Sequence, residues 1–526
     1  MWSKRGLILL LILFLGGFFR FCKLDWGGGY FFHPDEYHIA AAVERLSFPK
    51  HLNPQLFSYG SVIVYLIYFT RLFFSLISAQ FLKLNPILLG RFYAALFSTL
   101  TIIFWYLITR LLIKDKSLAY LTALLVATTP GLIQQAHFAT PESVLIFFIS
   151  LFLYGLISWQ KKSQNRFLYL AAVSLGLALG TKIVALIFLP VLILSSLMKT
   201  ISSFSFKSVI KTIFIPLFLV MLVYIFVSPY AFLDFSHFRS SMNYEIGVGR
   251  GAPLVFYTRQ FINTIPFQFQ LEKIFPYALG LPLLFLGILG LSKLILEPTD
   301  SLWLLIAFAF YFIFNASLFA KWTRFMAPVF PFFAFFAVYF LSGLKKHWFF
   351  RAGLFLVSLN FIWTVVFFSL YLRPDIRLVA NNWVKQNLPA ESTFFTEQGN
   401  MIEVPMQAEN KKISLDFYSL DDNSETQELL PAYLAQADYF IIQSRRIFSN
   451  HQRLPQQFPL TARFYNLLFS GGLGFQKIKE FNPWSPLPFS DEQAEETWSV
   501  FDHPVIRIYQ KNRPLSQEDY ETLLKI

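Results

Sequence analysis

Two adjacent carboxylates, Asp35 and Glu36, follow His33-Pro34 directly after the first apolar segment of a very apolar chain. Ionisable side chains at membrane depth are costly, and they usually line a cavity or a functional site. A carboxylate placed there could act as a general base that takes the proton of a hydroxyl group. The alternative interpretation, for the pair taken alone, is a solvated turn.

A third carboxylate, Glu142, closes the stretch His137-Phe-Ala-Thr140-Pro-Glu142. Thr140 could cap the next helix, Pro141 suits its first turn, and Glu142 would lie near the positive end of the helix dipole. Capping alone would explain Glu142. Three carboxylates with nearby imidazoles could also bind a divalent cation such as Mg, Mn or Zn. The spacing matches no dedicated metal motif, so both interpretations stay open.

Two basic groups begin or end apolar runs. Lys182 separates two such runs, and Lys321 and Arg324 precede a run that contains Pro328 and Pro331. Lys182 could simply extend to the lipid headgroups. Beside a carboxylate-lined cavity, however, such cations suit an anionic, phosphate-bearing substrate, which arginine can bind with two hydrogen bonds.

The composition of the chain is that of a membrane protein. The chain has 526 residues, of which 55% are hydrophobic and 14% charged, so we predict a polytopic α-helical membrane protein. Its excess of basic residues lies in short turns between apolar runs and indicates topology, so we predict no nucleic acid partner. The single cysteine, Cys22, excludes an intramolecular disulfide and a multi-cysteine metal site.

About eleven apolar runs are long enough, or nearly long enough, to span a bilayer. A further segment, Tyr59–Ala79, contains Arg71, and we predict an interfacial helix because the compact basic clusters then face the cytoplasm. The first run lacks a cleavage site and is predicted to remain as a signal anchor with a cytoplasmic N-terminus. The predicted spans are 6–22, 90–109, 117–133, 142–159, 167–181, 183–198, 212–229, 276–296, 301–319, 325–342 and 351–372.

This topology places the acidic and basic motifs on one side, the extracytoplasmic side of the plasma (inner) membrane. We predict a transmembrane domain over 1–372, with an outer interfacial region over 23–89 and an outer loop over 230–275. Residues 373–526 hold 15 Lys and Arg against 20 Asp and Glu, whereas 1–372 hold 29 against 11. The tail is therefore predicted to be a small extracytoplasmic α/β domain.

Short patterns in the tail support that prediction. Tyr439–Gln443 and Val505–Tyr509 resemble strands, and Val379–Leu388 has the pattern of an amphipathic helix. The glycine cluster 471–474 lacks the setting of a dinucleotide loop and is predicted to be a turn. Arg445 and Arg446 could contact phosphate or polysaccharide, but a solvated surface pair is the simpler interpretation.

Together, carboxylates that accept a proton and cations that stabilise a phosphate leaving group suit glycosyl transfer. Nucleotide-activated sugars are scarce outside the cytoplasm, so the donor is most simply a lipid-linked sugar and no nucleotide cofactor is expected. The chain resembles the GT-C superfamily of integral-membrane glycosyltransferases, in particular the protein O-mannosyltransferase and aminoarabinose transferase branch. The resemblance covers roughly 1–370 and rests on these stretches: His33-Pro-Asp-Glu36, Asn53-Pro-Gln-Leu-Phe-Ser-Tyr59, His137-Phe-Ala-Thr-Pro-Glu142, Gly176-Leu-Ala-Leu-Gly-Thr-Lys182 and Arg324-Phe-Met-Ala-Pro328-Val-Phe-Pro331.

The resemblance implies a role for each motif. Asp35 would be the catalytic base with Glu36 beside it, Lys182 and Arg324 would contact the polyprenyl phosphate, and Glu142 would organise a metal or the acceptor. Glu36 and Glu142 are accordingly the candidate metal ligands, and Tyr59 and His137 the remaining candidate substrate-binding residues. Tyr59 stands where the aminoarabinose branch often has lysine, which argues against assuming the donor of that branch.

The expected function is an inverting hexosyl or pentosyl transfer from a polyprenyl-phosphate sugar to a glycan, lipid or protein acceptor, within membrane lipids. A lipid-linked-sugar flippase or a secondary transporter is the alternative. Transporters usually show two related halves, which this sequence lacks. A non-catalytic assembly subunit is a third possibility, and it would tolerate the loss of all three carboxylates.

Overall fold

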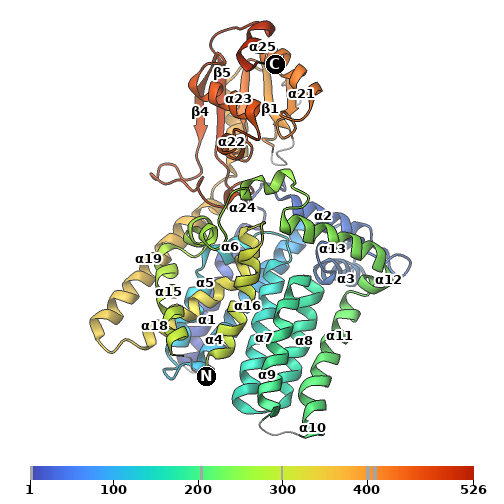
Figure 1. The fold of residues 1–526 in the computed structure, drawn as a ribbon, viewed down its shortest axis with the longest axis vertical. Helices are drawn as coiled ribbons and strands as arrows, with labels where there is room; N and C mark the ends of the chain where they lie inside the picture. The colour runs from blue at the N-terminus through green and yellow to red at the C-terminus, as the bar shows by residue number, and fades with distance from the viewer. Residues whose placement is uncertain (1–3, 202–204, 298–299, 399–402, 407–410, 526) are drawn as a thin grey trace. The chain divides into compact units, whose positions relative to one another are not determined.

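A computed structural model describes residues 4–201, 205–297, 300–398, 403–406 and 411–525 (Figure 1). The chain divides into two compact units. The first, called the helical unit, contains 1–25, 35–253 and 263–369, and the second, called the α/β unit, contains 26–34, 254–262 and 370–526. The main division falls close to the predicted boundary at 372, and two short segments of the N-terminal part belong to the α/β unit.

All eleven predicted apolar runs are helical for most of their length. Among the described residues, six helices are long and apolar enough to span a membrane, or seven if a bent pair counts as one span. The chain is thus a mostly helical, multi-pass type of protein, but the predicted number of eleven spans is not confirmed. The helices are α1 Lys4–Phe21, α2 Pro34–Glu44, α3 Val62–Ser75, α4 Pro86–Leu112, α5 Leu118–Ala127, α6 Pro130–Ala136, α7 Glu142–Lys162, α8 Asn165–Thr181, α9 Leu189–Ile201, α10 Phe206–Val209, α11 Ile215–Val227, α12 Tyr230–Leu233, α13 Phe235–Arg250, α14 Phe275–Ala278, α15 Leu281–Leu296, α16 Leu302–Ser317, α17 Thr323–Met326, α18 Phe330–Ser342 and α19 His347–Leu372.

Helices α7 and α8 run side by side in the helical unit (Figure 1). A Cβ atom at Gly155 of α7 would lie 2.8 Å from the carbonyl oxygen of Phe167, so the absence of a side chain permits this close packing. Trp105 of α4 donates a 2.9 Å hydrogen bond to the hydroxyl of Ser150 in α7. These contacts hold α4, α7 and α8 together.

The interfacial segment forms the 14-residue helix α3. At 1.5 Å per residue it would extend about 21 Å, short of the roughly 30 Å hydrocarbon core. Arg71 lies within α3 and pairs with Glu44 of α2 at 2.8 Å, so the structure gives it a protein partner. The short length fits the predicted interfacial position.

The α/β unit contains a five-stranded sheet in the order β2-β1-β3-β5-β4. Strands β2, β1 and β3 are parallel, and β5 and β4 are antiparallel to their neighbours. Phe394 packs into one core and Phe395 into the other, as alternation along a strand requires. The strands are β1 Thr393–Gln398, β2 Lys411–Asp416, β3 Tyr439–Ile442, β4 Phe475–Phe481 and β5 Ile506–Lys511, and the helices are α20 Ile376–Asn387, α21 Ser424–Gln436, α22 Phe448–Arg453, α23 Pro459–Ser470, α24 Glu496–Ser499 and α25 Gln517–Leu524.

The strands at 439 and 506, the amphipathic helix near 380 and the glycine turn after α23 are thus confirmed. The predicted surface position of Arg445 and Arg446 is wrong. Both are buried, Arg446 forms an ion pair with Glu496, and Arg445 donates a 2.7 Å hydrogen bond to the carbonyl of Ala494. A buried arginine requires such partners, and these lie some fifty residues further along the chain.

Candidate functional site

Asp35, in the first turn of α2, forms an ion pair with Arg324 at the start of the helix pair α17–α18. The two side chains are 17% and 22% exposed, so both remain open to a ligand. Arg324 also lies 3.4 Å from the hydroxyl of Tyr59, to which its Nη1 donates. Three predicted site residues, 289 positions apart at the extremes, therefore meet.

Lys182 continues this arrangement. Its Nζ donates a 2.8 Å hydrogen bond to Glu142 Oε1 and lies 5.7 Å from the ring centre of Tyr59. It also lies 5.1 Å from the ring of Phe325, so aromatic faces flank the ammonium group. Burial raises the pKa of Tyr59 well above its ordinary value, and its phenol therefore stays neutral. We call Asp35, Tyr59, Glu142, Lys182 and Arg324 the charged cluster.

Backbone contacts explain why Tyr59 and Lys182 meet. The N–H of Gly60 donates a 3.0 Å hydrogen bond to the carbonyl of Thr181, at the last turn of α8. A Cβ atom at Gly60 would lie 2.0 Å from the carbonyl oxygen of Gly180, so only glycine permits this approach. The backbone of Lys182 itself is extended, because α8 ends at Thr181.

Two buried atoms of the charged cluster have no hydrogen-bond partner: Nε of Arg324 and Oε2 of Glu142. Buried polar groups are nearly always paired, so an unpaired donor and acceptor in one cluster favour an interaction with a ligand or with water. The cluster thus combines a carboxylate, two cations and unused hydrogen-bonding capacity.

Glu36 has a different environment from Asp35. Its carboxylate receives two 2.7 Å hydrogen bonds from Arg91 of α4 and one of 2.7 Å from the backbone N–H of Ala139. Both side chains of the pair are fully buried. Glu36 therefore joins α2 to α4 and to the turn before α7.

His137 is also fully buried. Its Nδ1 lies 2.8 Å from the carbonyl oxygen of Ile133 and its Nε2 lies 3.0 Å from that of Cys22. The ring therefore connects the end of α6 to the segment after α1. This geometry suits a positioning role better than the predicted contact with substrate.

The predicted metal ligands do not fit a shared cation. Glu36 accepts three hydrogen bonds, and Glu142 is paired with Lys182. Within the described ranges, no group of three or more His, Cys, Asp or Glu side chains is placed to hold a metal ion.

Three residues around the cluster were missed in the sequence. Glu245 on α13 is exposed and interacts electrostatically with Arg324, Lys182 and Asp35. It lies in the 230–275 loop, where no spacing rule selects one residue. Phe325 looked like ordinary apolar sequence, and Arg91 is hidden within the apolar run of α4. An arginine inside such a run needs buried polar partners, and a carboxylate such as that of Glu36 is one candidate.

Comparisons with known proteins address the fold. Residues 48–240 match the family model described as dolichyl-phosphate-mannose-protein mannosyltransferase. No curated protein sequence matches the chain. Among solved structures, the chain is similar to the archaeal oligosaccharyltransferase AglB from Archaeoglobus fulgidus in complex with an inhibitory peptide and a dolichol-phosphate, at 12% identity and a TM-score of 0.52, covering 97% of this chain and 89% of that one.

Two further solved structures are also similar to the chain. An Archaeoglobus fulgidus oligosaccharyltransferase in complex with Zn and sulfate has 16% identity and a TM-score of 0.52, with 87% of this chain and 71% of that one covered. ArnT from Cupriavidus metallidurans in the apo state has 15% identity and a TM-score of 0.50, with 86% and 95% covered. The chain therefore has the fold of the GT-C integral-membrane glycosyltransferases and, over residues 48–240, resembles the protein mannosyltransferase family, as its motifs predict.

Proposed function

We propose that the chain is a glycosyltransferase that moves a sugar from a polyprenyl-phosphate-linked donor to an acceptor hydroxyl or similar group. The observation that carries this proposal is the charged cluster. It brings the partly exposed carboxylate of Asp35 together with two cations and a neutral phenol. A base and a phosphate-binding group, held together, are the two parts that this reaction needs.

The reaction assigned to the cluster is a single displacement. Asp35 takes the proton of the acceptor, the acceptor oxygen attacks the anomeric carbon, and the bond from that carbon to the phosphate oxygen breaks. The electron pair of this bond leaves with the lipid phosphate, and the anomeric configuration inverts. Arg324 and Lys182 stabilise the negative charge on the departing phosphate, with the unpartnered Nε of Arg324 available for it.

The remaining predicted site residues act through these groups. Tyr59 contacts both cations and orients them toward the donor. Glu142 holds Lys182, with its second oxygen open to the acceptor. Glu36 and His137 are assigned as positioning residues that hold α2 and the turn before α7 in place.

The comparisons and the charge pattern support the donor and the location. The matching family is described by a dolichyl-phosphate mannose donor, and the AglB structure holds a dolichol-phosphate. We place the cluster and the α/β unit on the extracytoplasmic face of the plasma (inner) membrane, with the N-terminus cytoplasmic, because basic clusters then lie inside. The acceptor is a glycan, a lipid or a protein.

The test is sugar release from a panel of radiolabelled polyprenyl-phosphate sugars by the full chain in detergent, without an ion gradient. The proposal expects the wild-type chain to cleave one donor, with water or an unnatural acceptor as the second substrate. It also expects Asp35→Asn to lose cleavage while Asp25→Asn, an exposed acid in the preceding loop, keeps it. Binding of a donor without any cleavage would overturn the proposal in favour of transport.

A further inference from the structure

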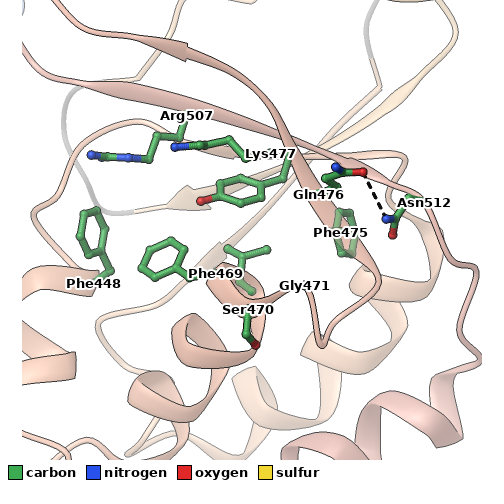
Figure 2. Close-up of a pocket in the computed structure, with 11 residues that line it drawn as sticks. Phe448, Phe469, Ser470, Gly471, Phe475, Gln476, Lys477, Arg507 and Asn512 are labelled. Atoms are coloured by element: carbon green, nitrogen blue, oxygen red, sulfur yellow. Dashed lines mark hydrogen bonds between the residues drawn. The ribbon is translucent and has the colours of Figure 1, made fainter.

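A groove of about 620 Å³ lies in the α/β unit beside strand β4 (Figure 2). Strand β4 is the last strand of the sheet, so among the described residues no further strand lies along its outer edge. Residues from α22, α23, β4 and β5 line the groove, among them Phe448, Phe469, Lys477, Arg507, Tyr509 and Asn512. All of them belong to one compact unit.

Aromatic rings form one side of this groove. The ring of Phe469 lies 5.3 Å from that of Phe448 and 6.2 Å from that of Tyr509. Phe469 is 40% exposed, although Leu468 beside it is buried in the core. A flat, exposed ring supported by other rings offers an apolar face to a ligand without needing to rearrange.

Polar groups also line the groove. Gln476 and Asn512 are exposed, and their amide groups lie 3.5 Å apart, as the dashed line in Figure 2 marks. Burial raises the pKa of Tyr509 to about 12, so its hydroxyl stays protonated. Nη1 of Arg507 is buried and has no hydrogen-bond partner. Amides, a hydroxyl and a guanidinium offer donors and acceptors to a polyhydroxylated molecule.

The charges of the groove argue against a phosphate ligand. Lys477 pairs with Glu480 at 2.7 Å, and Arg507 pairs with Glu492 at 2.5 Å. Carboxylates therefore accompany both cations, and a phosphate or nucleotide would meet negative charge beside each of them.

The strand edge argues against an added peptide strand. Strand β4 is irregular between Lys477 and Lys479, and both lysines are exposed. Irregular strands with exposed lysines are the means by which proteins block pairing at a sheet edge. A ligand that uses ring faces and amides rather than backbone pairing suits the groove better.

We propose that this groove binds a saccharide, with an apolar face of one sugar ring stacked on Phe469 and its hydroxyl groups bonded by Gln476, Asn512 and Arg507. A pocket lined by aromatic side chains with a few placed polar groups is the usual form of a small-ligand site. The inference goes beyond the proposed transfer and does not rest on it, because every residue involved lies outside the charged cluster.

The test uses ligand-observed saturation-transfer NMR on the full chain in lipid nanodiscs, because sugar-headed detergents would compete. The probes are mannotriose, chitotriose and maltotriose, with inorganic triphosphate and an unglycosylated peptide alongside. We expect at least one trisaccharide to bind, and Phe469→Ala to weaken it by about five- to tenfold. Leu487→Ala, an equally exposed apolar residue of the same unit, should bind as the wild type does.

A second variant, Asn512→Ala, guards against misfolding, because its exposed side chain packs into no core. It should also weaken the trisaccharide, with an unchanged unfolding temperature. The proposal is overturned if no trisaccharide binds, if only triphosphate or peptide binds, or if Phe469→Ala and Asn512→Ala bind the sugar like the wild type. None of these outcomes bears on donor cleavage, so the two proposals fail separately.

Discussion

Asp35 and Glu36 are neighbours in the first turn of α2, yet their surroundings are opposite. The partly exposed carboxylate of Asp35 pairs with Arg324 in the charged cluster. Nε of Arg324 and Oε2 of Glu142 in this cluster have no hydrogen-bond partner. The carboxylate of Glu36 is fully buried and receives three hydrogen bonds of 2.7 Å. Two acids of one motif can therefore have different roles: Asp35 is placed to face a ligand, and Glu36 holds the helix that presents it.

Replacing Asp35, the more exposed of the two acids, should change activity most. Asp35→Asn removes the proposed base and keeps the size of the side chain, so donor cleavage should fall by about 10²- to 10⁴-fold. The unfolding temperature should change little, because Asp35 is partly exposed and its neighbours remain. The measurement is the initial rate of radiolabelled sugar release, with Asp25→Asn as the control. Full activity in a folded Asp35→Asn protein would remove Asp35 from the mechanism.

Replacing the buried Glu36 should lower stability more than activity. Glu36→Gln leaves Arg91 charged, buried and without its partner, which typically costs about 3–5 kcal/mol. We expect a lower unfolding temperature in a detergent-resistant thermal assay, with activity lost only in proportion to the folded fraction. Asp25→Asn, which changes an exposed acid in the loop before the same helix, should change neither. A stable but inactive Glu36→Gln protein would instead make Glu36 part of the chemistry.

Arg324→Lys tests the partner of Asp35. Lysine keeps the charge but cannot present two parallel donors, so it should weaken the hold on a phosphate. Because a hydrogen bond to a charged group is worth about 1.5–3 kcal/mol, the rate at low donor concentration should fall by roughly 10- to 100-fold. Arg110→Lys in the last turn of α4 is the matched control. An unchanged donor dependence would exclude Arg324 from phosphate binding.

Much of this arrangement was predictable from the sequence. The order of the acidic and basic motifs predicted that Asp35, Tyr59, Glu142, Lys182 and Arg324 share one place, and the structure brings all five together. Helical runs and several elements of the α/β unit followed from hydrophobic patterning, because one buried face sets the period.

The rest depended on partners far along the chain. The sequence around Glu36 does not show that Arg91 forms an ion pair with it. The sequence around Arg446 likewise does not show its ion pair with Glu496. The predicted helix cap at Thr140 is also wrong. The helix begins at Glu142 with Pro141 in the cap position, and Thr140 provides no capping hydrogen bond. Pairwise burial is a tertiary property, so residue types alone could not separate the open acid from the closed one.

A second buried cluster of charged groups should make the stability of the α/β unit depend on pH. In the α/β unit, His503 lies between Asp502, at 2.6 Å, and Asp491, at 2.7 Å. Burial alone would lower the pKa of His503, but the charges of Asp502 and Asp491 raise it to about 10. The unfolded chain has a histidine pKa of about 6.5, so this cluster stabilises the fold fully below that pH and loses its contribution as the pH rises toward 10.

The expected outcome is therefore an unfolding temperature of the α/β unit that falls between pH 7 and pH 10. Each pH unit in this window changes the free energy of unfolding by at most about 1.4 kcal/mol. His503→Gln should be less stable at pH 7 and should lose most of this pH dependence. A wild-type unfolding temperature that stays constant from pH 7 to pH 10 would contradict the assignment.

Removal of divalent metal ions should change donor cleavage least of all. The sequence suggested a cation between Glu36 and Glu142, and a similar oligosaccharyltransferase structure holds Zn. Here, however, Arg91 and Ala139 saturate Glu36, and Lys182 neutralises Glu142, so a cation would have to displace two guanidinium hydrogen bonds and an ammonium group. We expect donor cleavage to be the same with a strong chelator as without it, once the donor itself is shown to be unaffected. If the chelator stops cleavage and added Zn, Mn or Mg restores it, the site holds a cation during the reaction, either through Glu36 after its hydrogen bonds break or through the unpartnered Oε2 of Glu142. The comparison between an open and a closed carboxylate would then describe only the metal-free state.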